Sequence, residues 1–115
     1  MDSVETVDIE TGLFKYVLIK VSDKQTKQEK YIVRGYNWAP YHGDIVEKIE
    51  PQLKAMKLSC FCVGGGRIEH DSEAKTIFVF GYSQGYGKAD HSITCELLRQ
   101  KYPDYNKIYW SDEGY

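Results

Sequence analysis

The chain has 115 residues, of which 42% are hydrophobic and 28% charged, and its formal net charge is −2. This length fits a single domain with a modest core of its own. The slightly acidic balance argues against nucleic acid as a partner, because phosphate binding needs a basic stripe. No run approaches the roughly 20 apolar residues that cross a bilayer, and the acidic N-terminus is unlike a signal peptide. We therefore expect a cytoplasmic monomer that binds neither nucleic acid nor a membrane.

The first third of the sequence predicts two paired strands. We expect residues 1–12 to be a flexible N-terminal lead-in and residues 13–115 to form the domain. Residues 13–21 are rich in β-branched and aromatic side chains, which is typical of a strand. A polar turn then leads to a second strand at residues 31–36, which we expect to pair antiparallel with the first.

A helix is predicted from about Tyr41 onward. Apolar residues recur there at helical spacing, at Ile45, Ile49, Leu53 and Met56. Pro51 lies inside this pattern, and a proline removes a backbone donor and clashes with the preceding turn. We therefore expect the helix to kink or to divide near Lys48.

The second half of the chain completes the predicted fold. Strands are expected at residues 58–63, 76–80 and 107–110. A second helix is expected to start near Ala89, or near Asp90 as its N-cap, and to end before Pro103. Together the elements predict a single-domain α+β fold, with a mainly antiparallel or mixed sheet of about six strands and two helices packed on it.

Three features of the sequence suit an anion. Lys15 interrupts the apolar face of the first strand, so it either extends to water or directs a cation into a pocket. The glycine-rich loop 81–87 can turn N–H groups toward a ligand, or can be a structural turn. It is not a nucleotide-binding P-loop, because Tyr82 and Ala89 stand where that motif requires Gly and Ser or Thr. Arg67 follows a second glycine run. Its guanidinium either binds two phosphate oxygens at once or is simply exposed at a β-bulge. Together these features indicate a phosphate pocket.

Metal binding is not predicted. No two of the three histidines stand four residues apart, as they do on a zinc-binding helix. Cys60 and Cys62 are too close for the usual Cys-x₂₋₄-Cys spacing of zinc sites. We expect reduced cysteines, no metal and no cofactor.

His42 differs from His70 and His91 by its position. It falls where a proline-containing loop enters the first predicted helix. The positive end of a helix disfavours the imidazolium form, so a neutral ring would be available as a base. A capping or packing role is the alternative, and structural roles are expected for the other two histidines. A Ser-His-Asp triad stays open, although Ser83 lacks the Gly-x-Ser-x-Gly setting.

Short motifs follow one another along the chain: Leu13-Phe-Lys-Tyr-Val-Leu-Ile19, Ile32-Val-Arg-Gly-Tyr36, Tyr41-His42-x-Asp44-Ile45, Gly64-Gly-Gly-Arg-Ile68, Gly81-Tyr-Ser83, Tyr86-Gly87, His91, Lys101-Tyr-Pro-Asp-Tyr105 and the closing Gly-Tyr. In these motifs and their order, nearly the whole chain resembles the phosphohistidine phosphatase family, also called the Janus/Ocnus family. The resemblance implies a metal-free phosphatase that hydrolyses the P–N bond of phosphohistidine, with phosphohistidine-containing proteins as its partners.

The resemblance also implies site residues. The catalytic histidine of the family falls on His42, and its substrate-binding residues fall on Lys15, Arg67, Ser83, Gln84 and Gly85. The backbone N–H of Gly43 is a further expected donor to the phosphoryl oxygens. We expect His42 to act as a general base on water, with nucleophilic attack by His42 as the competing mechanism. The alternative functions are a phosphatase for phospholysine or a small phosphoramidate, and a non-enzymatic phosphate-binding regulator.

Overall fold

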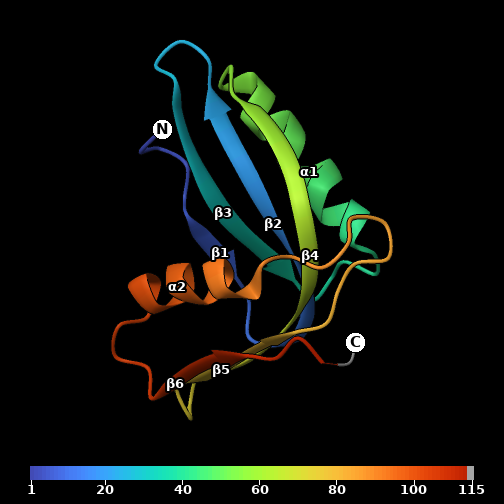
Figure 1. The fold of residues 1–115 in the computed structure, drawn as a ribbon, viewed down its shortest axis with the longest axis vertical. Coiled ribbons are helices and arrows are strands. Elements are labelled where there is room, and N and C mark those ends of the chain that lie inside the picture. Colours follow the sequence, from blue (N-terminus) through green and yellow to red (C-terminus); the bar gives the residue numbers. More distant parts are fainter. Residues whose placement is uncertain (114–115) are drawn as a thin grey trace.

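Six strands and two helices make up the part of the chain that the computed structural model describes, residues 1–113 (Figure 1). The strands are β1 (Val7–Ile9), β2 (Gly12–Asp23), β3 (Gln28–Tyr36), β4 (Ser59–Asp71), β5 (Thr76–Phe80) and β6 (Lys107–Trp110), and the helices are α1 (His42–Ala55) and α2 (His91–Lys101). The closing Gly-Tyr motif lies outside the described residues. Neither helix is long and apolar enough to cross a membrane.

The strands form one mixed sheet in the order β1-β3-β2-β4-β5-β6. β2 pairs antiparallel with both β3 and β4, and β4 pairs antiparallel with β5. The two outer strands are parallel to their neighbours, β1 to β3 and β6 to β5. The predicted α+β fold, with a mainly antiparallel or mixed sheet and two helices, is confirmed.

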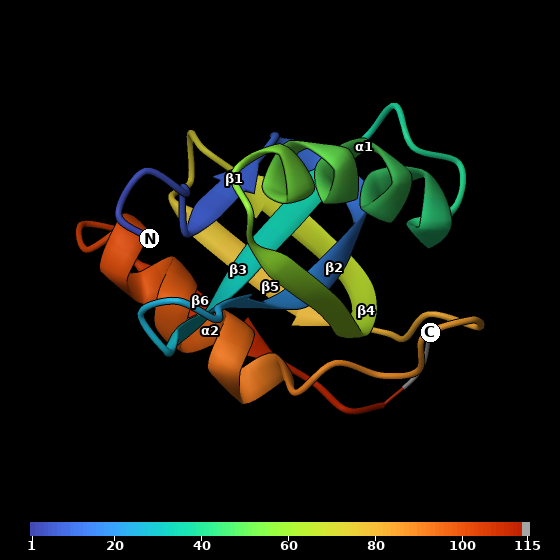
Figure 2. The ribbon, with the colours of Figure 1, turned by 90° about the horizontal axis from the view of Figure 1, so that it is seen from above.

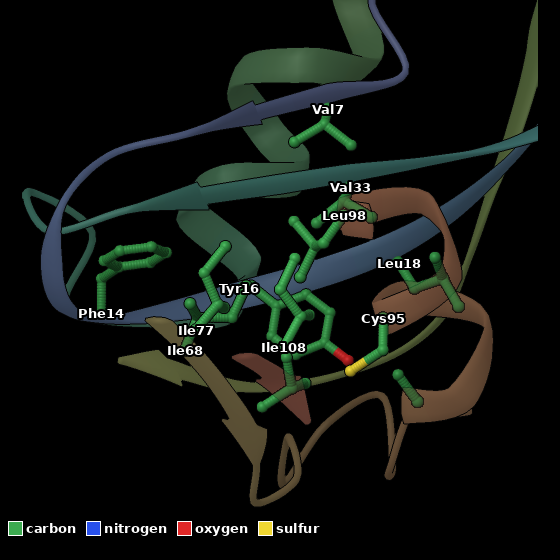
Figure 3. Packing of buried hydrophobic residues seen from close by; sticks show 12 residues of the cluster. Val7, Phe14, Tyr16, Leu18, Val33, Ile68, Ile77, Cys95, Leu98 and Ile108 are labelled. Atoms are coloured by element: carbon green, nitrogen blue, oxygen red, sulfur yellow. The ribbon is translucent and has the colours of Figure 1, made fainter. Parts of the chain in front are cut away.

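The two helices cover opposite faces of the sheet, α1 on one side and α2 on the other (Figure 2). Successive side chains of a strand point to opposite faces, and β2 is buried on both. Its two sets of side chains join separate clusters: Val17, Ile19 and Val21 pack with α1, and Tyr16 and Leu18 pack with α2 (Figure 3). By the same alternation, Lys15 lies on the α1 face.

The segment 1–12, expected to be a flexible lead-in, is tied to the sheet in the structure. Val4 and Val7 are buried, and β1 pairs in parallel with β3. The guanidinium of Arg34, on β3, anchors the segment by donating a hydrogen bond to the backbone oxygen of Glu5 at 2.6 Å. A three-residue strand is too short to show an alternating pattern, so the sequence offered no signal for it.

Helix α1 runs through Pro51 without the division expected near Lys48. Pro51 is exposed, so its ring points to solvent, while Ile49 and Leu53 on either side of it are buried against the sheet. Packing of this apolar face outweighs the missing hydrogen bond, since most helix stability in proteins comes from tertiary contacts.

Strand β4 continues through the glycine run, where the sequence predicted a strand that ended at residue 63. The pairing register with β2 shifts opposite Leu18 and Ile19, which marks a β-bulge beside Gly64. A Cβ at Gly65 would stand 2.7 Å from a ring carbon of His42, and one at Gly66 would stand 2.7 Å from a ring carbon of His91. The glycines therefore let histidines approach β4 closely from both faces.

Candidate active site

A cavity of about 660 Å³ opens where α1 begins. Three distant parts of the chain line it: strand β2, the loop that enters α1 and the loop after β5. The lining residues are Lys15, Pro40, Tyr41, His42, Gly43, Ser83, Gln84, Gly85 and Tyr86. The structure thus brings six of the seven predicted site residues into one cavity.

Arg67 is the predicted site residue that does not line the cavity. It lies on β4 directly opposite Lys15 on β2, so the two side chains are neighbours on the same face of the sheet. On its other side the guanidinium stands over the ring of Phe80, 5.8 Å from the ring centroid. Its charge still reaches the cavity, because it contributes to the lowered pKa of His42.

His42 is the first residue of α1, and hydrogen bonds fix both the backbone around it and its ring. The backbone N–H of Tyr41, the N-cap residue, donates to the Asp44 carboxylate at 3.0 Å, which fixes the start of the helix. The His42 ring donates from Nε2 to the backbone oxygen of Gly66 at 2.9 Å. A carbonyl oxygen only accepts, so Nε2 carries the proton, and a neutral ring has its lone pair on Nδ1.

The surroundings of His42 favour this neutral ring. Burial is the largest cause that lowers its pKa below the ordinary value, and the positive charges of Lys15 and Arg67 lower it further. The hydrogen bond to Gly66 acts in the opposite direction but does not reverse the shift. We expected the end of the helix to keep the ring neutral; burial and two cations give the same direction by other routes.

The loop after β5 is a closed turn fixed to β4. The N–H of Ser83 donates to the oxygen of Gly87 at 3.1 Å, and the N–H of Gly87 donates back at 2.8 Å. The N–H of Gly65 on β4 donates to the same Gly87 oxygen at 3.0 Å. Ser83 is therefore buried as a turn residue, whereas Gln84 and Gly85 form the exposed tip beside His42.

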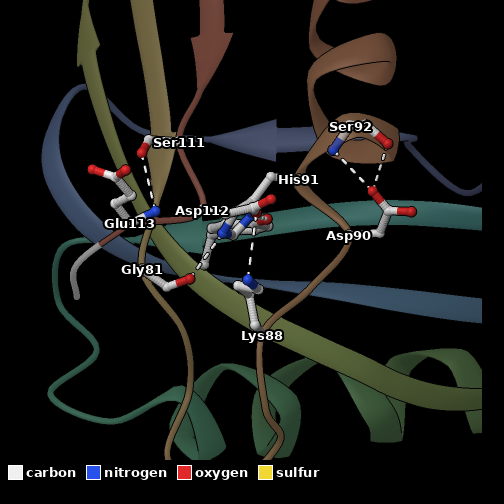
Figure 4. Close-up of polar contacts among 9 residues, drawn as sticks. Gly81, Lys88, Asp90, His91, Ser92, Ser111, Asp112 and Glu113 are labelled. Carbon is white, nitrogen blue, oxygen red and sulfur yellow. Dashed lines mark hydrogen bonds and ion pairs between the residues drawn. The ribbon is translucent and has the colours of Figure 1, made fainter.

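His91 anchors the root of this loop from the far side of β4. Its Nε2 donates to the backbone oxygen of Gly81 at 2.8 Å (Figure 4), and its Nδ1 accepts from the Tyr16 hydroxyl at 2.6 Å. Burial raises the pKa of Tyr16 well above its usual value, so the hydroxyl stays protonated and donates. An ion pair between Lys88 and Asp112, 3.5 Å long, closes the other end of the loop (Figure 4).

The three histidines lie in different parts of the fold and do not meet in one site. His70 donates from Nδ1 to the oxygen of Glu10 at 2.7 Å and accepts from the Tyr105 hydroxyl at 2.6 Å. Across residues 1–113, no three His, Cys, Asp or Glu residues are grouped so that they could hold a metal ion.

Residue reasoning missed three contributors to the cavity wall, Pro40, Tyr41 and Tyr86. Tyr41 is 72% exposed and Tyr86 is 40% exposed, so their rings form the rim of the cavity. Their closeness in sequence to His42 and Gly85 was a signal for this placement. Burial raises the pKa of Tyr86, which keeps its hydroxyl neutral at physiological pH.

The fold and the cavity define a small α+β protein with a neutral histidine at a helix N-terminus, beside two cations. The sequence model of the Janus/Ocnus family matches residues 1–106, and the chain belongs to this family.

Two similar proteins carry the name "14 kDa phosphohistidine phosphatase". The one from Sus scrofa is 47% identical over 118 residues, which cover 97% of this chain and 93% of the relative. The one from Homo sapiens is 46% identical over 118 residues, with 97% and 94% covered. The "Sex-regulated protein janus-A" of Drosophila yakuba is 51% identical over 104 residues, which cover 90% of this chain and 76% of the relative.

Proposed function

We propose that the protein is a protein phosphohistidine phosphatase, which hydrolyses the P–N bond of phosphohistidine. Its similarity to two proteins of that name extends over more than nine tenths of each chain. The observation that carries the proposal is His42, a neutral imidazole in the wall of a cavity that also holds a lysine.

The cavity supplies groups that suit the oxygens of a phosphoryl group. Lys15 brings a positive charge from β2, and Arg67 adds a second charge from the neighbouring strand. The N–H of Gly43 lies in the first turn of α1, where backbone donors have no partner within the helix. In the loop after β5, the N–H groups of Gln84 and Gly85 are the proposed donors, because that of Ser83 is used inside the turn.

In the proposed reaction, His42 acts as a general base. Its Nδ1 takes a proton from water while the water oxygen attacks phosphorus. The P–N bond breaks, the leaving imidazole nitrogen takes up a proton from solvent, and inorganic phosphate leaves. His42 then releases its proton to solvent. A protonated nitrogen leaves readily, so the reaction needs less electrophilic assistance than a metal would give. The cations and backbone donors then stabilise the negative charge on the phosphoryl oxygens.

Release of inorganic phosphate from a phosphohistidine peptide tests the function. We expect His42→Ala to slow it by about a hundredfold or more, the usual contribution of a general base, in a variant that is still folded at the assay temperature. Wild-type turnover should persist in excess EDTA. His70→Gln is the matched control for loss of a histidine, because His70 lies outside the cavity.

A folded His42→Ala variant that releases phosphate as fast as the wild type would overturn the proposal. Rapid quenching with labelled substrate decides the role of His42. The general-base role predicts no label on the protein, and a phosphorylated His42 trapped during turnover would establish the nucleophilic mechanism instead.

A further inference from the structure

Three aromatic rings form a continuous strip on the outer strands of the sheet, in which Phe78 and Phe80 are half-buried and Tyr109 is exposed. Phe78 stacks on Phe80 with ring centroids 4.9 Å apart and 14° between the ring planes. Phe78 also stacks on Tyr109 of β6, at 4.6 Å and 24°. Ile77 and Val79, which alternate with the phenylalanines, are fully buried on the α2 face. The aromatic strip, Phe78, Phe80 and Tyr109, therefore lies on the α1 face.

Helix α1 packs on β2, β3 and β4, whereas the aromatic strip lies further out, on β5 and β6 (Figure 1). Tyr109 is 38% exposed, and Leu13, on the same face of β2, is 50% exposed. Stacked rings that remain in contact with water at the edge of a sheet are a feature of interaction surfaces.

The strip is continuous with the cavity through Arg67. Its guanidinium stands over Phe80 at one end of the strip and beside Lys15, which lines the cavity, on the next strand. At the other end of the strip, the Lys107 ammonium lies 4.2 Å from the centroid of the Tyr109 ring. A chain whose phosphoryl group sits in the cavity can therefore run across these rings.

We propose that the aromatic strip binds the polypeptide of the protein substrate, through an apolar side chain near the phosphohistidine. This inference rests on the proposed function and names what its substrate must carry beyond the phosphoryl group. From Lys15 on β2 to Phe78 at the centre of the strip there are two strand spacings and an offset of two residues along the strand, about 12 Å in all. An extended chain advances about 3.3 Å per residue, so the apolar side chain stands about four residues from the phosphohistidine.

The charges around the strip select the occupant. Arg67 and Lys107 flank the rings, and both would repel a lysine or arginine of the substrate. Glu69, in register with Phe78, is exposed and would repel an acidic side chain placed over that ring. An aromatic or aliphatic side chain meets neither penalty and gains the stacking and burial that the rings offer.

Synthetic phosphohistidine peptides test this surface. The set has phenylalanine four residues before the phosphohistidine, four residues after it, or serine at both places, and free phosphohistidine serves as the small substrate. On the wild type, one phenylalanine peptide should have a KM roughly fivefold lower than the serine peptide, with similar kcat. In Phe78→Ser this preference should vanish, while free phosphohistidine is turned over within about twofold of the wild-type rate.

Tyr109→Ser is the second variant, and it should weaken the same preference. Phe61→Ser is the matched control, because Phe61 is 70% exposed on a different part of β4 and should leave the preference intact. Equal KM values for all three peptides on the wild type, or a preference that survives in both strip variants, would overturn the inference alone. If the wild type releases no phosphate from any of these substrates, the proposed function fails and the inference falls with it.

Discussion

His42 joins helix α1 to strand β4, and this link sets its protonation. Nε2 is committed to the oxygen of Gly66, so the chemistry of the ring rests with Nδ1. Burial disfavours the imidazolium, and the neighbouring lysine and arginine act in the same direction. Nδ1 is therefore the ring nitrogen with a lone pair available to accept a proton at neutral pH.

The pKa of His42 should depend on Lys15. We expect Lys15→Met to raise the pKa of His42, because removing a nearby cation removes a repulsion that disfavours the imidazolium. NMR titration of the ring signals measures the shift directly. Lys20→Met is the matched control on the same strand: Lys20 pairs with Glu29, 3.6 Å away, and should leave the His42 titration unchanged. Identical His42 titrations in Lys15→Met and wild type would show that Lys15 has no influence on the ring.

At this scale the sequence predicted which side chains come together, because the residues of the candidate site lie in short motifs. Lys15, His42 and the tip residues Gln84 and Gly85 meet in one cavity, although they come from distant parts of the chain. The use of the Ser83 N–H inside the turn could not be foreseen, since it depends on how the loop closes on Gly87. The position of Arg67 beside the cavity depends on the β2–β4 register, which the sequence does not state.

At the scale of elements, β4 departs furthest from expectation. Glycines favour turns, so the run at 64–66 indicated the end of a strand, yet the strand continues to Asp71. The reason is that two histidines from other parts of the chain pack closely against the glycines, His42 on one face of β4 and His91 on the other. A local pattern cannot show that a glycine is needed for a neighbour 20 or more positions away. The sequence likewise could not show that α1 continues through Pro51 without dividing, because the packing that stabilises the helix comes from the sheet.

Substituting Gly65 tests this account of β4. In Gly65→Ala, the new Cβ would stand 2.7 Å from the His42 ring and 2.7 Å from the oxygen of Tyr16. We expect the free energy of unfolding to fall by about 1–3 kcal/mol, the usual cost of overpacking. Phosphate release should fall as well, because the His42 ring is displaced from Gly66.

Gly85→Ala is the matched control for stability, because its Cβ would meet nothing within 4 Å. Urea unfolding of the two variants measures the difference. Equal stabilities of Gly65→Ala and Gly85→Ala would contradict the close approach described for β4.

At the scale of the whole molecule, the N-terminal segment completes the sheet. Its first strand adds an outer parallel neighbour to β3, and Val7 joins the cluster packed beneath α2. The Tyr36 hydroxyl donates to the Asp8 carboxylate at 2.7 Å, a second attachment of the segment to β3. Residues of the segment expected to be a lead-in therefore contribute a strand to the sheet and side chains to its core.

Val7→Ala should reveal this contribution. Since Val7 is 4% exposed, we expect the substitution to lower the free energy of unfolding by about 1–3 kcal/mol. Thr11→Ala is the matched control, because Thr11 is exposed in the same segment and should change stability by less than about 0.5 kcal/mol. Thermal or urea unfolding compares them, and two equally mild effects would mean that the segment does not share in the cooperative core.

The pairing of β2 with β4 has a consequence for how the protein gains and loses activity. Lys15 lies on β2 and Gly66 on β4, about 50 positions later in the sequence. His42 is bonded to Gly66, so its ring lies near Lys15 only when β2 and β4 are paired in this register. No single segment of the chain carries the whole candidate site, because Lys15, His42 and the loop after β5 meet only in the folded domain. Activity and sheet structure should therefore disappear together, at one denaturant concentration, as a two-state domain requires.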